Sequence, residues 1–142
     1  MAKNKTGKVK AVGGVFFRAN NPKETREWYA KHLGLQTDPY GTNFAWRQVD
    51  NPNKAGYTQW SPFDGDTEYF GKVEQQFMIN YRVDDLDALL ASLREEGVEI
   101  VGDVVQESFG RFAHIIDNEG RRVELWEPID DEYEKILDGV TK

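Results

Sequence analysis

A strand, a helix cap and a helix occur twice in this chain, about 64 residues apart, and this repeat restricts the possible folds more than any other feature. A strand is expected over 9–18, and Asn21 and Pro22 then supply the capping side chain and first-turn proline that begin a helix. A second strand is expected over 76–83, before an acidic cap at 84–85 and a helix with a leucine stripe. The sequence therefore predicts two halves built to one plan.

Short strands are expected after each helix. In the first half they are expected over 35–37, 43–49 and 56–61. In the second half they are expected over 103–107, 111–116 and 121–126. Each half then has the order βαβββ, and one such unit alone would leave a face of its sheet unburied. We therefore predict an α+β fold in which two βαβββ units pair their curved mixed sheets around a cleft, with the helices outside.

The boundaries of these parts follow from the same patterns. Residues 1–8 are expected to be a disordered N-terminus, and 9–128 to form one domain. Within this domain the first unit covers 9–70 and the second covers 74–128. An amphipathic pattern predicts that 129–142 form a C-terminal helix.

Charge and composition restrict the partners. The net charge of −7 disfavours nucleic acid and anionic membranes, so we expect neither as a partner. No apolar run approaches the roughly 20 residues of a membrane span. The chain has no cysteine, which excludes disulfides, thiolate catalysis and cysteine-ligated zinc. This composition fits a cytoplasmic protein.

One face of the predicted sheet carries polar side chains, because strand residues alternate between two faces. The row facing away from the helices is expected to hold Gly14, Phe16, Arg18, Gln76, Met78, Asn80, Arg82, Arg122, Glu124 and Trp126. Such a row offers both hydrogen bonds and a stacking surface, as a small organic ligand requires. Alternatively, Arg18, Arg82 and Glu124 are structural ion pairs at strand ends, which is the simpler interpretation for the two arginines.

Three stretches in order, WYAKHLGL (28–35), YRVDDLDALLASLREEGVEI (81–100) and DNEGRRVELWEP (117–128), together resemble the glyoxalase/bleomycin-resistance/extradiol-dioxygenase superfamily, also called the vicinal oxygen chelate superfamily. The resemblance covers about 9–128 and implies a glyoxalase-like domain. Metal-dependent members of that superfamily hold a divalent ion in the cleft. Their ligands are a histidine or similar residue on the first strand of each half and a glutamate on the last strand, sometimes with a further glutamate from the first half.

Carried onto this chain, the resemblance places the final glutamate at Glu124. The two first-strand positions fall on Gly14 and Met78, and the further glutamate falls near Gln59. Glycine has no side chain, methionine offers a soft thioether, and glutamine offers only an amide oxygen. We therefore expect no metal cofactor, with a Ni, Zn, Fe or Mn ion held by Glu124 and His114 as the alternative. His114 is also a candidate metal-free acid–base partner of Glu124, although a lone strand histidine is more often structural.

Three functions remain open at this point. The first is a small-molecule binder or metal-independent enzyme with a degraded metal site. Its candidate catalytic residues are Glu124 and His114, and its candidate ligand-binding residues are Phe16, Gln59, Met78, Asn80, Arg82, Arg122 and Trp126. The second is a metal-dependent lyase, isomerase or dioxygenase. The third is a non-catalytic interaction scaffold, and the resemblance also implies a homodimer.

Overall fold

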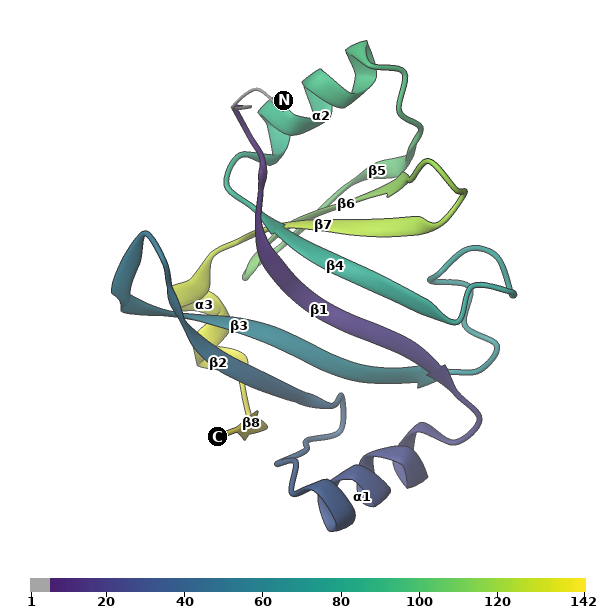
Figure 1. Cartoon of the computed structure of the whole chain (residues 1–142), viewed down its shortest axis with the longest axis vertical. Coiled ribbons are helices and arrows are strands. Elements are labelled where there is room, and N and C mark those ends of the chain that lie inside the picture. Colours follow the sequence, from purple (N-terminus) through teal and green to yellow (C-terminus); the bar gives the residue numbers. More distant parts are fainter. Residues whose placement is uncertain (1–5) are drawn as a thin grey trace.

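A curved sheet of eight strands and three helices make up the computed structural model, which describes residues 6–142 (Figure 1). The strands lie in the order β5-β6-β7-β4-β1-β3-β2-β8. At its centre β1 (Val9–Ala19) pairs antiparallel with β4 (Phe77–Val83), so the two halves join within one chain. The predicted α+β fold is confirmed.

The second half is a complete βαβββ unit. After β4 come α2 (Leu86–Glu95), β5 (Ile100–Glu107), β6 (Gly110–Ile116) and β7 (Arg122–Pro128). The Asp85 side chain accepts a hydrogen bond from the backbone of Ala88 and caps α2, as the sequence predicted. The leucine stripe of α2 is buried against β4, β6 and β7 and forms the larger apolar core.

The first half has only two strands directly after its helix. It consists of β1, α1 (Pro22–Leu33), β2 (Thr42–Gln48) and β3 (Asn51–Asp64). The Asn21 side chain caps α1 and Gly34 ends it in the left-handed conformation, as expected. The short strand predicted over 35–37 is wrong, because this stretch carries no strand and only an isolated bridge follows it.

The missing strand of the first half comes from the end of the chain. β8 (Val140–Thr141) pairs in parallel with β2 and takes the fourth place. The prediction of a helix over 129–142 is therefore wrong in extent, since α3 covers only Asp130–Ile136. Long-range bonds explain the difference: Gly139 O accepts from Asn43 N at 3.0 Å, and Thr141 Oγ1 accepts from Gln36 N at 3.0 Å.

The start of the described chain is packed against the second helix. Gly7 is buried with a φ of 71°, and a side chain there would meet the Asp85 carbonyl at 2.4 Å. Lys8 N donates to Asp84 Oδ1 at 2.8 Å. The disordered terminus predicted over 1–8 is thus wrong for residues 6–8, and residues 1–5 lie outside the described part of the chain.

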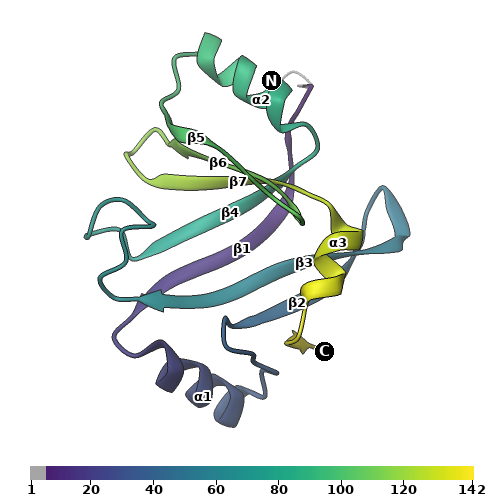
Figure 2. The ribbon, with the colours of Figure 1, turned by 180° about the vertical axis from the view of Figure 1, so that it is seen from behind.

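The two faces of the sheet differ in how they are covered. The outer face carries α1 and α2, which lie at opposite ends of the molecule (Figure 1). The inner face, which carries Glu124, is partly covered by α3 (Figure 2). There Tyr133 is 6% exposed, packs 4.9 Å from Trp126 and donates to Asn43 Oδ1 at 2.7 Å. In residues 6–142 no helix is long and apolar enough to cross a membrane.

Candidate functional site

Glu124 is a buried carboxylate on the inner face and holds three hydrogen-bonding partners. It lies in the middle of β7 and is 2% exposed. The strand register places Asn80 of β4 on one side of it and His114 of β6 on the other. Asn80 Nδ2 donates to Oε1 at 2.7 Å, and His114 Nε2 lies 2.8 Å from Oε2. With the Glu124 carboxylate as the acceptor, Nε2 of His114 is the donor of this hydrogen bond.

The third partner of Glu124 is Tyr69, from the loop between β3 and β4. Its hydroxyl donates to Oε2, and its ring lies edge-on to His114 at 4.9 Å and stacked on Phe63 at 5.6 Å. Burial, then the charge and hydrogen bond of Glu124, raise the pKa of Tyr69 well above its usual value of 10.0. The phenol is therefore a hydrogen-bond donor throughout the neutral pH range.

Two arginines hold this loop in place. The guanidinium of Arg18 donates to four loop carbonyl oxygens at 2.7–3.1 Å, those of Gly65, Thr67, Lys72 and Gln75. Arg122 donates to the Tyr69 carbonyl at 3.3 Å. Phe70 is fully buried in the apolar cluster beneath the loop. Arg18 is thus a structural anchor, although its partners are carbonyls and not the carboxylates of the predicted ion pairs.

A cavity of about 630 Å³ lies over the Glu124–His114 pair. It is bounded by β3, by the Tyr69 loop and by β5, β6 and β7. Its lining residues are Phe16, Gln59, Phe63, Tyr69, Val101, Gly102, Asp103, Val105, Glu107, Phe109, Phe112, Ala113, His114, Arg122 and Glu124. The size and the mixture of aromatic and polar groups are those of a small-molecule site.

The structure brings together some of the predicted site residues and separates others. Phe16, Gln59, Arg122, His114 and Glu124 line the cavity. Asn80 lies behind Glu124 and is 1% exposed. Met78 is also 1% exposed and packs with Phe16 and Phe70 in an apolar cluster. Neither Asn80 nor Met78 reaches the cavity wall, and Arg82 and Trp126 lie elsewhere on the same face.

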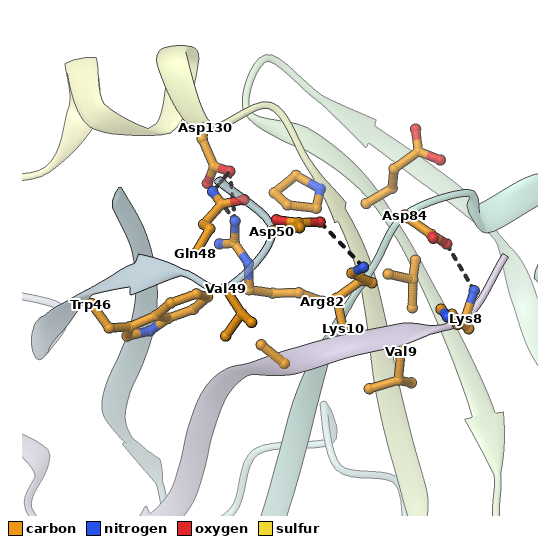
Figure 3. Close-up of a pocket in the computed structure, with 14 residues that line it drawn as sticks. Lys8, Val9, Lys10, Trp46, Gln48, Val49, Asp50, Arg82, Asp84 and Asp130 are labelled. Carbon is orange, nitrogen blue, oxygen red and sulfur yellow. Dashed lines mark hydrogen bonds and ion pairs between the residues drawn. The ribbon is translucent and has the colours of Figure 1, made fainter. Parts of the chain in front are cut away.

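Arg82 forms a buried ion pair at a second cavity, of about 650 Å³ (Figure 3). Its Nη2 lies 2.6 and 2.7 Å from the two carboxylate oxygens of Asp130, at the start of α3. The guanidinium lies 5.2 Å from the ring of Trp46 and 5.3 Å from that of Trp126. Trp126 also stacks on Phe112 at 5.6 Å. These contacts agree with the interpretation of Arg82 as one partner of a structural ion pair.

The donor set at Glu124 does not fit the divalent metal of the superfamily. Gly14 offers no side chain to a metal, and a Cβ added there would lie 2.7 Å from the Phe16 ring, which would have to shift. Both Glu124 oxygens already accept from neighbouring donors, one of them from His114. Among residues 6–142 no group of three or more His, Cys, Asp or Glu side chains could hold a metal ion.

Sequence reasoning missed Tyr69 and three of the phenylalanines that line the cavity. The missed phenylalanines are Phe63, Phe109 and Phe112. Tyr69 lies in a loop, where strand alternation does not predict which way a side chain points. The sequence signal for Tyr69 is its position beside Phe70 in a loop rich in glycine and aspartate. Phe70 is buried and fixes the loop, which leaves Tyr69 over the site.

A comparison with protein-family models found no match, and a comparison with curated proteins found none either. Solved structures do match. A Streptomyces coelicolor methylmalonyl-CoA epimerase in complex with 2-nitronate-propionyl-CoA is 17% identical, with a TM-score of 0.65 over 86% of this chain and 99% of that one. The methylmalonyl-CoA epimerase of Mycobacterium tuberculosis is 22% identical, with a TM-score of 0.58 over 89% and 93%.

A structure named as an NAD-dependent benzaldehyde dehydrogenase from Legionella pneumophila is 15% identical, with a TM-score of 0.51 over 81% of this chain and 97% of that one. These identities are low, so the likeness concerns the fold alone. The chain has the vicinal oxygen chelate fold of the methylmalonyl-CoA epimerases, and the resemblance seen in the sequence is confirmed at this level. The different names show that the fold does not define the activity.

Proposed function

We propose that this protein binds a small organic molecule, without a metal, in the cavity over Glu124 and His114. The observation that carries the proposal is the combination in one cavity of about 630 Å³ of a buried carboxylate–imidazole pair and four phenylalanine rings. The rings supply apolar area, and the pair supplies directional hydrogen bonding. The degraded metal site is part of this proposal and rests on Gly14 and on the full set of donors already at Glu124.

The cavity is large enough for a ligand with one aromatic ring and a polar group. Burying one such ring removes about 150–250 Å² from water. At about 25 cal/mol per Å², this is worth about 4–6 kcal/mol before the costs of association. The polar group then needs a partner that the apolar walls do not provide. Gln59 supplies such a partner at the wall, because its amide group can both donate and accept a hydrogen bond.

The test is a thermal-shift screen of small aromatic compounds on the wild type and on Val105→Trp. Val105 lines the cavity and is 53% exposed, so a tryptophan there fills the space without disturbing the core. A ligand at 100 times its Kd stabilises by about 2.7 kcal/mol, which is roughly 5–10 °C in Tm for a chain of this size. Val49→Trp is the matched control, because Val49 is 98% exposed and lies at the other cavity. Hits that bind Val105→Trp as well as wild type would refute the site.

A second candidate function is metal-independent acid–base catalysis at the same site. The observation in its favour is the Nε2–Oε2 distance of 2.8 Å between His114 and Glu124 on a cavity wall. In such a pair Glu124 accepts the Nε2 proton of His114, which leaves Nδ1 as the nitrogen that takes a proton from a carbon acid and returns it, as isomerisation requires. The test is solvent deuterium incorporation into any bound ligand. Exchange that persists in both Glu124→Gln and His114→Gln would exclude this function.

The homodimer and the cytoplasmic location stay predictions. In support of a homodimer, the outer face of the two central strands leaves Phe77 58% and Val12 40% exposed. Large exposed apolar side chains on a sheet often mark an interface. Light scattering of the purified protein measures the oligomeric state, and a monomer at micromolar concentration would contradict the dimer. The interaction-scaffold alternative requires partner binding that survives Val105→Trp.

A further inference from the structure

We propose that the ligand of this cavity is a small organic cation, a protonated amine or quaternary ammonium group on an apolar body. This inference rests on the proposed function and adds the charge of the ligand to it. It is carried by two properties of the lining that are independent of each other. These are the charges at the mouth of the cavity and the aromatic rings within it.

The acidic charge at the mouth comes from β5, the edge strand of the sheet. Val101 is paired with His114 and Val105 with Phe112, and the register shifts between these two pairs. Asp103 lies in the shifted segment, Glu107 follows at the end of the strand, and both line the cavity. Within residues 6–142 neither carboxylate has a hydrogen-bonding or ion-pairing partner.

The lining contains one arginine, Arg122, whose Nε is buried without a hydrogen-bonding partner in the described part of the chain. Arg122 donates to the Tyr69 carbonyl, and its guanidinium lies under Gly71, where an added Cβ would be 3.2 Å from Nε. Its charge therefore lies against the loop. The lining holds three carboxylates, those of Asp103, Glu107 and Glu124, against this one guanidinium, so acidic side chains predominate. The whole chain has a net charge of −7, which attracts cations over a longer range.

The rings supply the second property. Phe16, Phe63, Phe109, Phe112 and Tyr69 all border the same space. Aromatic faces attract a desolvated ammonium through their quadrupole, and they solvate its alkyl groups as well. A CoA thioester of the kind bound in the similar epimerase structures carries several phosphate charges. The acidic mouth disfavours such a ligand here.

The experiment compares three probes of one shape and different charge: 2-phenylethylamine, 2-phenylethanol and 3-phenylpropionate. Their Kd values are measured at pH 7 by protein-observed NMR, which also reports the residues perturbed. We expect the amine to bind about tenfold more tightly than the carboxylate, with the alcohol between them. The amine's affinity falls as the salt concentration rises. Signals of Phe112 and Val105 shift on binding.

Variants that each remove one carboxylate charge then show which side chains cause the preference for the amine. Asp103→Asn and Glu107→Gln each reduce the amine's preference severalfold, and both side chains are exposed, so the fold is kept. Glu95→Gln removes the same charge from an exposed position on α2 and leaves the preference unchanged. Equal binding of all three probes in the cavity would overturn the cation proposal and leave the proposed function standing. Binding of none of them at millimolar concentration would overturn both.

Discussion

Replacing Asp130 by asparagine removes the charge that neutralises Arg82, and this change separates a structural role of Arg82 from a ligand-binding one. The side chains of Arg82 and Asp130 are only 5% and 11% exposed. In the Asp130→Asn variant the guanidinium stays between Trp46 and Trp126 without an anion beside it. Breaking a buried pair by removing one partner costs about 3–5 kcal/mol.

The magnitude is large compared with the total stability of about 5–15 kcal/mol expected for a domain. With a urea m value of about 2 kcal/mol per M, the unfolding midpoint falls by about 1.5–2.5 M. Asp131→Asn is the control, because Asp131 is exposed and occupies the same first turn of α3. Its stability stays within about 0.5 kcal/mol of the wild type.

Urea unfolding, monitored by tryptophan fluorescence, measures the midpoint. The Kd values of 2-phenylethylamine, 2-phenylethanol and 3-phenylpropionate measure binding at the Glu124 cavity. The double variant Arg82→Met with Asp130→Leu regains most of the lost stability, since no charge is then left buried. Asp130→Asn does not change the ligand Kd at the Glu124 cavity. A loss below 1 kcal/mol would mean that water reaches the pair, and the structural account of Arg82 would fail.

Three further predictions test the site and the sheet. Elemental analysis after incubation with Ni, Zn, Mn and Fe(II) finds less than stoichiometric metal, and stoichiometric metal that is lost in Glu124→Gln would refute the donor analysis. Tyr69→Phe lowers the unfolding free energy by about 1.5–3 kcal/mol through one charge-assisted hydrogen bond. The pKa of Tyr69 is higher in the folded state than in the unfolded state, where it is near 10.0. The Tyr69 hydroxyl therefore contributes its full stabilisation below pH 10, and this contribution is lost as the pH rises through the folded-state pKa. Alkaline unfolding curves that coincide for wild type and Tyr69→Phe would contradict this. Deleting residues 138–142 removes β8 and lowers the urea midpoint, and a midpoint equal to wild type would show that β2 does not depend on that strand.

Local chemistry made most of the fold predictable. The caps at Asn21 and Asp85 act within three residues of chain, and the structure contains both bonds. Strand alternation correctly grouped Asn80, Arg82 and Glu124 on one face. Alternation gives the face and not the position along the strand, however. Arg82 lies two residues beyond Asn80 and therefore lines a different cavity.

The errors come from contacts between distant parts of the chain. The helical pattern through Tyr133 and Ile136 continues to Val140, but pairing with β2 takes the last residues into a strand. Tyr69 reaches Glu124 across 55 residues through a loop. Neither contact leaves a periodic signal in the sequence. The caps and strands of a single half carry no information about them.

The place of β8 has a consequence for how the protein is made. The N-terminus of a chain emerges from the ribosome first, and domains often begin to fold during synthesis. The second half holds all of its own strands, whereas the sheet of the first half is completed by residues 140–141. The edge of β2 therefore stays unpaired until residues 140–141 have emerged from the ribosome.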